Sequence, residues 1–167
     1  MRTFTIVHPS PLGDLLISGS ESFIIGVRYA DLHTDLVETA VPANEAPALL
    51  RRCATHLDEY FAGWRRTFGL QFQQEGTPFQ QTVWQGLLKI PFGQTKTYAE
   101  LARQIGSAKG SRSVGLANGK NQIAIIVPCH RIIGASGNLT GYNGGMWRKK
   151  WLLDHEKRVA HGVLSLF

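Results

Sequence analysis

The feature that most constrains the fold of this chain is an apolar run that ends in a cluster of reactive side chains. Residues 123–127 read Ile-Ala-Ile-Ile-Val, and Pro128, Cys129, His130 and Arg131 follow directly. A β-branched run of this length is typical of a buried strand. Because proline cannot donate to a strand ladder, Pro128 favours the end of such a strand. The pattern predicts a buried strand that presents Cys129 at the edge of a pocket.

The neighbours of Cys129 suit thiolate chemistry. A cysteine reacts as its thiolate, and adjacent cationic groups lower the thiol pKa. We expect His130 and Arg131 to act on Cys129 in this way. The second cysteine, Cys53, lies on the apolar face of a predicted helix and is interpreted as a packing residue. Neither cysteine has the spacing of a metal ligand, and the chain does not resemble a small disulfide-stapled fold.

Composition places the chain among ordinary globular proteins. Its 167 residues are 43% hydrophobic and 18% charged, enough for one sizeable domain or two small ones. The net charge is +6, and the basic surplus lies in the half that contains Cys129. This charge favours an acidic partner such as nucleic acid, although an ordinary basic protein has the same composition. With no secretory signal and no apolar run near the ~18 residues of a membrane span, we expect a cytoplasmic protein that contacts no membrane.

The first part of the chain predicts a small α/β module. Short alternating segments over 2–7, 14–18 and 23–29 predict a three-stranded antiparallel meander. Residues 68–73 predict one more short strand further along the chain. Between them, residues 31–42 are polar and irregular, and Asn44 is expected to cap a helix over 45–61. We place a domain boundary after this module, which gives an N-terminal α/β domain, 1–75, and a C-terminal domain, 76–167.

Three helix starts follow the boundary. Thr77-Pro78-Phe79-Gln80 and Thr97-Tyr98-Ala99-Glu100 each have the form of a capping box, and Ser111 is expected to cap a short helix over 112–118. The second and third helices, joined by a glycine-containing turn, predict a helix-turn-helix, although many short helix pairs bind nothing. Small side chains on the third helix suit a close, sequence-independent approach to DNA.

The last part predicts a loop and a helix. Residues 140–145 are rich in glycine, which suits either a close backbone approach to a ligand or a simple connector. A helix over 146–155 is expected to turn two tryptophans inward and three basic residues outward, namely Trp147, Trp151, Arg148, Lys149 and Lys150. It brings Glu156 back towards the core.

The 126–131 segment Ile-Val-Pro-Cys-His-Arg and five further blocks of this C-terminal half resemble one known family. In chain order, the further blocks are Thr-Pro-Phe-Gln, Thr-Tyr-Ala-Glu, Ser-Arg-Ser-Val-Gly with Asn121, Tyr-Asn-Gly-Gly, and Trp-Leu-Leu-Asp-His-Glu. In this order and spacing they resemble the O6-alkylguanine-DNA alkyltransferases, also called methylated-DNA–protein-cysteine methyltransferases. Residues 1–75 resemble the variable N-terminal domain of that family more loosely. The resemblance implies a small N-terminal antiparallel sheet with a helix, followed by a mostly helical winged helix-turn-helix domain.

The resemblance also implies a direct-reversal DNA repair protein that reacts once. Cys129 would take the alkyl group from O6-alkylguanine, or from O4-alkylthymine, and keep it as a thioether. His130 would deprotonate Cys129 through a bound water, and Glu156 would orient His130. Asn121 would brace the turn around the cysteine, and Tyr98 would donate a proton to the departing base.

Reaching a base inside a duplex requires base flipping. The resemblance implies that Arg112 fills the vacated stack and that Tyr98 crowds the phosphate that rotates. It also implies that the helix of Arg112 contacts the minor groove through Ser113, Ala117 and Asn118. The substrate pocket is formed by Val127, Tyr142, Asn143 and Gly144. Asn143 stands where a smaller serine or alanine is common in the family. No metal and no cofactor are expected. The expected partner is double-stranded DNA that contains alkylated guanine. In the absence of DNA the protein is expected to be a monomer.

Two other functions fit the residues alone. A non-catalytic winged-helix DNA binder would use Cys129 only for packing, and its mass would not change on DNA. A Cys-His hydrolase would turn over and would need an oxyanion site. Alkyltransferase-like proteins, which bind lesions without repairing them, lack the acceptor cysteine that this chain has.

Overall fold

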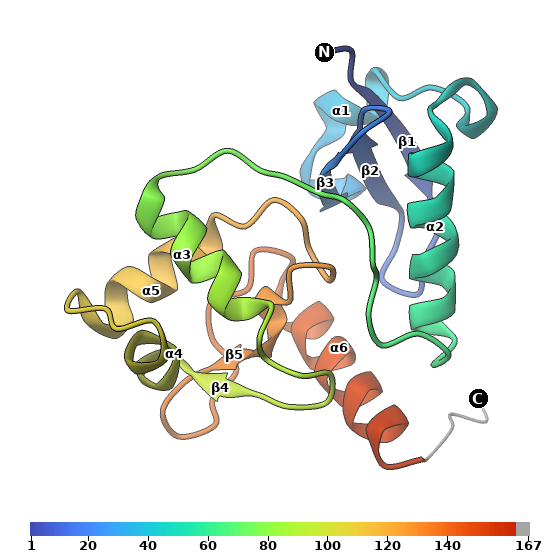
Figure 1. Ribbon diagram of the computed structural model, residues 1–167. Coiled ribbons are helices and arrows are strands. Elements are labelled where there is room, and N and C mark those ends of the chain that lie inside the picture. The colour runs from blue at the N-terminus through green and yellow to red at the C-terminus, as the bar shows by residue number, and fades with distance from the viewer. Residues whose placement is uncertain (163–167) are drawn as a thin grey trace. The chain divides into compact units, whose positions relative to one another are not determined.

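The computed structural model describes residues 1–162 and divides the chain into two compact units, Met1–Gln74 and Glu75–Phe167 (Figure 1). The first unit contains a three-stranded sheet, and the second contains a two-stranded sheet surrounded by helices. The mixed α/β class expected from the sequence is confirmed.

The sheet of the first unit is an antiparallel meander in the order β1-β2-β3. Its strands are β1 (Phe4–His8), β2 (Leu15–Gly19) and β3 (Ile24–Tyr29), close to the predicted ranges. Helix α2 (Ala48–Phe61) lies against β2 and β3 and buries the apolar stripe expected from its sequence. Cys53 is fully buried on that stripe, and burial raises the pKa of its thiol to about 12. Cys53 is therefore a packing residue.

Three details of the first unit differ from the predictions. Asn44 does not cap α2: it lies in a 3-10 turn, η2 (Ala43–Glu45), and the helix begins after Pro47. The residue before a proline is disfavoured in helical conformation, so Ala46 is extended and the two segments stay separate. The region expected to be irregular contains a 3-10 turn and a short helix, η1 (Ala30–Leu32) and α1 (Thr34–Glu38). The predicted strand over 68–73 is reduced to an isolated bridge between Ile24 and Phe72.

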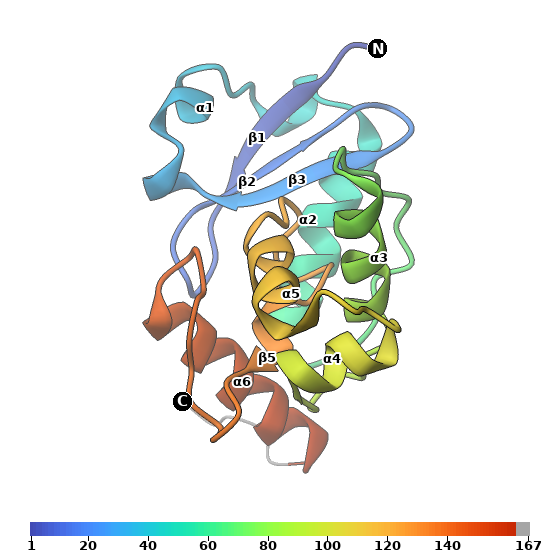
Figure 2. The same ribbon diagram turned by 90° about the vertical axis from the view of Figure 1, so that its left-hand side faces the viewer.

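The second unit is mostly helical (Figure 2). Its elements in order are α3 (Pro78–Leu87), β4 (Lys96–Thr97), α4 (Tyr98–Gln104), α5 (Gly110–Gly119), η3 (Cys129–Arg131), β5 (Ile132–Ile133) and α6 (Met146–Ala160). Strands β4 and β5 pair in parallel, which brings the start of α4 next to the segment that follows the cysteine. Helices α3, α4 and α5 pack on one another.

Both predicted capping boxes are present. The Thr77 hydroxyl accepts from the Gln80 amide at 3.1 Å, and the Gln80 side chain accepts from the Thr77 amide at 2.9 Å. Thr97 and Glu100 make the same pair of bonds at 3.1 and 2.9 Å. Each box satisfies two amides that a helix start otherwise leaves unpaired, which fixes where α3 and α4 begin.

Helix α5 starts earlier than predicted, and Ser111 is not its cap. The helix begins at Gly110, and the residue at its N-cap position, Lys109, makes no side-chain capping bond. Gly110 has a φ of +77°, a left-handed conformation that glycine adopts without strain, so the chain turns into the helix one residue before Ser111.

The segment 123–127 is not a strand. It is buried as expected, but it forms consecutive turns that lead into the 3-10 turn η3. Short-range backbone bonds close these turns, with the Ile126 amide donating to Ala124 and the Val127 amide to Ile123. Ile125 has a φ of +72°, which a β-branched residue rarely adopts. The β-branched pattern therefore predicted burial correctly and the backbone conformation wrongly.

Two of the three basic residues predicted to face outward from helix α6, Arg148 and Lys149, face the interior instead. Lys149 is 0% exposed and Arg148 is 5% exposed, whereas Trp147 is 57% exposed. The Arg148 guanidinium donates to the Gly144 carbonyl and lies over the Trp147 ring. Of the three basic residues, Lys150 is exposed as predicted and pairs with Asp154.

Candidate active site

Asn121 holds the turns that precede the cysteine. Its side-chain amide donates to the Val127 carbonyl at 2.9 Å and to the Ile123 carbonyl at 3.3 Å, and its oxygen accepts from the Ile123 amide at 3.2 Å. These bonds replace the pairing that a strand would have supplied to the same backbone groups. One side chain thus ties both ends of the segment that delivers Cys129.

Cys129 is buried at the start of η3, with an exposed fraction of 8%. Burial raises the pKa of its thiol, while a hydrogen bond from Asn121 and the positive charge of Lys149 act in the opposite direction. The expectation that His130 and Arg131 lower this pKa is not met, because both of those side chains are engaged with Glu156. The thiol is therefore held neutral at rest and needs a base before it can react.

His130 has the protonation pattern of a base. It is fully buried, and its Nε2 lies 2.7 Å from Oε2 of Glu156. Because Glu156 is an acceptor, Nε2 carries the proton and Nδ1 has a free lone pair. Nδ1 is buried and has no hydrogen-bond partner among the described residues. Burial lowers the pKa of His130 despite the opposing charge of Glu156, so the ring is neutral near pH 7.

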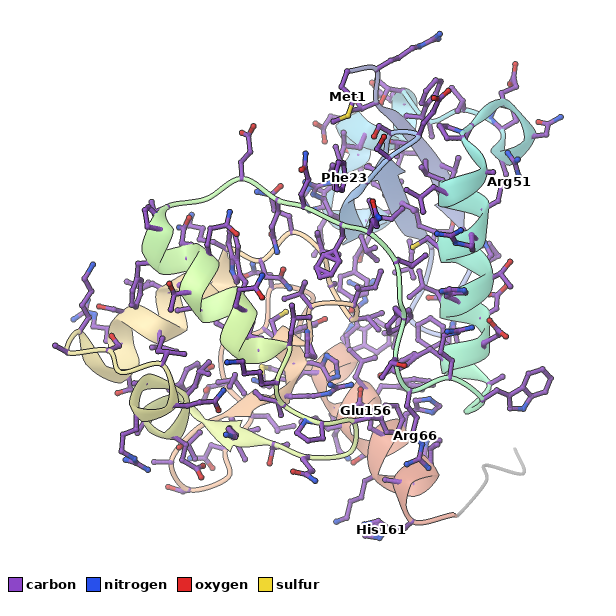
Figure 3. The ribbon with its side chains drawn as sticks, in the orientation of Figure 1. Met1, Phe23, Arg51, Arg66, Glu156 and His161 are labelled. Carbon is purple, nitrogen blue, oxygen red and sulfur yellow. The ribbon has the colours of Figure 1, made fainter. Side chains whose placement is uncertain are left out.

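Arg131 fixes Glu156 in place. Its Nε and Nη2 donate to the two Glu156 oxygens at 2.8 and 3.0 Å, and its Nη1 donates to the Ile90 carbonyl at 2.7 Å. The Gly93 amide also donates to Glu156, at 3.2 Å. Burial alone would raise the pKa of the Glu156 carboxyl, but His130 and Arg131 outweigh it and hold that pKa well below its usual range. Figure 3 shows Glu156 on α6.

Lys149 is a residue that the sequence analysis assigned to the surface. It lies fully buried on α6 and donates from Nζ to the Thr140 carbonyl at 2.7 Å. Burial lowers the pKa of Lys149 to about 8, and the Cys129 thiolate opposes that shift. The signal was present in the sequence: Lys149, seven residues before Glu156, lies on the same helix face. Since Glu156 was expected to face the core, Lys149 had to face it too.

Tyr98 and Arg112 line one cavity of about 360 Å³ between α4 and α5. Gly115 lines the same cavity, and a Cβ at that position would lie at an ordinary contact distance, 3.4 Å, from the Tyr98 ring. Tyr98 also donates from its hydroxyl to the Thr140 carbonyl at 3.2 Å. The structure therefore joins the two predicted base-flipping residues at a single opening.

The residues of α5 that were predicted to contact DNA differ in their exposure to solvent. Arg112 is exposed and Ser113 is half-buried on α5, but Ala117 and Asn118 are buried at 3% and 2% exposure. The Asn118 amide donates to the Cys129 carbonyl at 3.3 Å. The buried Asn118 side chain thus takes part in holding the cysteine turn, and the predicted contacts of Ala117 and Asn118 with DNA stay predictions.

The four predicted pocket residues come from the cysteine turn and the glycine-rich loop. Val127 and Gly144 are buried, Tyr142 is half-buried and Asn143 is exposed. The Asn143 side-chain amide donates to the Gly119 carbonyl at the end of α5. Within residues 1–162, no group of three or more His, Cys, Asp or Glu side chains could hold a metal ion, and no helix is long and apolar enough to cross a membrane.

Comparison with known proteins gives matches over nearly the whole chain. Residues 4–74 match the family model described as 6-O-methylguanine DNA methyltransferase, ribonuclease-like domain. Residues 78–158 match the model described as 6-O-methylguanine DNA methyltransferase, DNA binding domain. A methylated-DNA–protein-cysteine methyltransferase of Mycobacterium bovis is 46% identical, covering 95% of this chain and 94% of the relative. One of Methanosarcina acetivorans is 44% identical, covering 90% and 96%.

Solved structures agree with these matches. The crystal structure of Mycobacterium tuberculosis OGT in complex with DNA has a TM-score of 0.80 and 42% identity, covering 95% of this chain and 94% of that one. The O6-methylguanine-DNA methyltransferase of Pyrococcus kodakaraensis has a TM-score of 0.61 at 20% identity, and that likeness concerns the fold alone.

Proposed function

Because the chain belongs to the 6-O-methylguanine DNA methyltransferase family, we propose that Cys129 accepts the alkyl group of O6-alkylguanine in double-stranded DNA. The activity is that of a methylated-DNA–protein-cysteine methyltransferase, which repairs DNA by direct reversal. O4-alkylthymine, which carries a comparable alkyl ether, is a second substrate in this proposal. The observation that carries the residue assignment is the unpaired Nδ1 of His130, next in the chain to a buried thiol.

The first step is removal of the thiol proton. His130 holds its own proton on Nε2 against Glu156, so Nδ1 accepts the proton of Cys129 through a bridging water. Glu156 stabilises the imidazolium that results, and Arg131 keeps the carboxylate oriented. Lys149 supplies the positive charge that favours the thiolate inside a buried site.

The second step is a displacement at carbon. A lone pair of the Cys129 sulfur forms the new S–C bond while the bond between guanine O6 and the alkyl carbon breaks, and its electrons leave with the guanine. The departing base takes a proton from the Tyr98 hydroxyl, which solvent restores. The resulting thioether has no easy route to hydrolysis, so each chain reacts once and needs no cofactor.

Access to the base depends on α4 and α5. The target atom lies inside the duplex, so the nucleotide is extruded at a cost of about a few kcal/mol. Arg112, exposed on α5 and lining the same cavity as Tyr98, fills the vacated stack, and Tyr98 crowds the phosphate that rotates. In this proposal the domain from residue 76 onward is the DNA-binding and acceptor domain, and the protein is a monomer in the absence of DNA.

A hydrolase function is disfavoured by the backbone at the cysteine. Acyl transfer needs amide donors directed at the developing oxyanion. The Cys129 amide is already bonded to the Val127 carbonyl at 2.8 Å, so it is not free for that purpose.

The test is to locate the transferred group after reaction with a duplex that contains O6-methylguanine. Peptide mass mapping is expected to find the methyl group on Cys129 in the wild type and in Cys53→Ala, and to find none in Cys129→Ser. A methyl group on Cys53, or repair by Cys129→Ser, would overturn the assignment. Binding with no change of mass would instead support a non-catalytic DNA binder.

A further inference from the structure

Helix α5 borders two hollows of the second unit. The first is the cavity of about 360 Å³ against α4, which Arg112 and Gly115 of α5 line together with Tyr98. The second is a larger hollow of about 720 Å³ between α5 and the start of α3, here called the α3/α5 hollow. Helix α5 packs against both α3 and α4, and none of its residues lines both hollows (Figure 2). It therefore forms a ridge with one hollow on each side.

The α3/α5 hollow combines an apolar wall with two lysines. Leu116 is 66% exposed and lines this hollow together with Pro78 and Phe79. Lys109, directly before α5, and Lys120, directly after it, also line the hollow. The Lys109 Nζ lies 4.7 Å from the centroid of the Phe79 ring, and this contact holds its charge at the wall of the hollow.

This combination fits a sugar–phosphate backbone. The deoxyribose rings offer apolar surface, and the phosphates between them carry one negative charge each. No acidic side chain of residues 1–162 lines either hollow, so no carboxylate there repels an anion. Proteins that bind the minor groove often place leucine or another apolar side chain against the DNA, which is a use for the exposed Leu116.

The position of α5 between the hollows assigns one DNA strand to each. A helix that enters the minor groove has a strand on either side, because the groove is only about 6 Å wide. In the proposed function, Tyr98 and Arg112 act on the nucleotide that leaves the duplex, so the alkylated strand lies along the first cavity. The α3/α5 hollow, on the other side of α5, then faces the complementary strand.

We propose that the α3/α5 hollow binds the backbone of the complementary strand, with Leu116 against its deoxyriboses and Lys109 and Lys120 against its phosphates. The inference rests on the proposed function, which brings α5 into the minor groove. These contacts hold the strand that keeps its place while Arg112 fills the space left in the other strand. The three side chains are positioning residues, because they act on the duplex and not on the reacting atoms.

Two sets of variants separate the charges from the apolar contact. Lys109→Gln combined with Lys120→Gln removes both charges, and Leu116→Ala shortens the apolar side chain. Lys89→Gln and Leu88→Ala are the matched controls, because both residues are exposed at the end of α3 and line neither hollow. Thermal unfolding of each variant checks that these exposed substitutions leave the fold intact.

The experiment measures the dissociation constant of a duplex that contains O6-methylguanine over a range of salt concentrations. All chains also carry Cys129→Ser, so that no repair occurs during the measurement. Each phosphate contact contributes about 0.9 to the slope of log affinity against log salt concentration, so the double lysine variant is expected to lose about 1.8 of that slope. Leu116→Ala is expected to weaken binding about five-fold at every salt concentration and to keep the slope. Both controls are expected to match the parent chain.

The assignment to the complementary strand is tested by replacing the phosphates of one strand at a time with uncharged methylphosphonates. A neutral complementary strand is expected to weaken binding by the parent chain and to have little effect on the double lysine variant. A neutral alkylated strand is expected to weaken binding by both chains alike.

A double lysine variant with the salt slope of Lys89→Gln would overturn the proposal, and so would equal effects of the neutral complementary strand on both chains. Equal affinities of Leu116→Ala and Leu88→Ala would overturn the apolar contact. If the variants change self-association of the chain without DNA and leave DNA binding unchanged, the hollow binds a second copy and the proposal fails. A wild-type chain that binds the duplex but takes up no methyl group would refute the acceptor role of Cys129 instead, so the two failures are distinguishable.

Discussion

Replacing Glu156 by glutamine removes one charge from the centre of the site while keeping the shape of the side chain. In the folded protein, the Glu156 carboxylate accepts from His130 at 2.7 Å, from Arg131 at 2.8 and 3.0 Å, and from the Gly93 amide at 3.2 Å. Glutamine can keep some of these bonds but cannot neutralise the guanidinium. Arg131 is only 6% exposed, so its charge would remain buried without a counter-ion.

The expected cost follows from that burial. Breaking a buried ion pair by removing one partner costs about 3–5 kcal/mol, a large share of a typical folding stability of about 5–15 kcal/mol. For a chain of this length, that loss lowers the melting temperature by roughly 10 °C. We also expect repair to slow by at least about 100-fold, because His130 loses the acceptor that fixes its tautomer and stabilises its cation.

The assay combines thermal unfolding with single-turnover methyl transfer. The matched control is Glu59→Gln, whose partner Arg65 lies at 3.2 Å in a pair that is about one-third exposed and is therefore worth about 0–1 kcal/mol. If Glu156→Gln lowers the melting temperature by no more than Glu59→Gln does, the reasoning is refuted. The double variant Arg131→Met with Glu156→Gln is expected to regain stability without regaining repair.

Further changes in the second unit test separate parts of the account. Lys149→Met removes a positive charge that lowers the pKa of the acceptor thiol, so that pKa is expected to rise, seen as a higher midpoint in iodoacetamide reactivity against pH. Lys150→Met is the exposed control, and equal midpoints would contradict the role of Lys149. Asn121→Ala leaves buried backbone groups unpaired and is expected to cost about 1–3 kcal/mol in denaturant unfolding, whereas a loss near zero would contradict the bracing role. His130 acts when neutral and its pKa lies below 6.5, so the repair rate should persist below pH 6.5 and fall only as the pH passes through the lowered pKa; a fall centred above 6.5 would contradict a neutral base. Arg112→Ala is expected to slow repair of duplex DNA more than reaction with free O6-benzylguanine, and equal losses on both would refute a role in base flipping.

The sequence predicted correctly those helices and strands whose defining interactions lie between residues close together in the chain. The capping boxes at Thr77 and Thr97 were readable because both partners of each bond lie within four residues. The three strands of the first unit were readable because alternation of apolar side chains is set by the strand itself. These features locate α3, α4 and the meander to within about two residues.

The errors have tertiary or side-chain causes. The run 123–127 has strand-like composition, but the Asn121 side chain supplies the hydrogen bonds that a neighbouring strand would have supplied, so the run turns back on itself. On α6, the hydropathy pattern predicted that Lys149 faces outward, whereas in the structure its buried Nζ donates to the Thr140 carbonyl. The bond between Asn143 and Gly119 joins a loop to the end of α5, and no local sequence pattern relates these two segments.

The central claim is that Cys129 is a consumed reagent, and counting transferred groups tests it most directly. The protein is incubated with an excess of duplex that contains O6-methylguanine, and the intact mass of the chain is followed together with the amount of repaired DNA. The account predicts that repair stops when every chain has gained one methyl group, and that repaired guanine equals protein consumed. Repair that continues beyond one guanine per chain, or a chain that returns to its original mass, would contradict it.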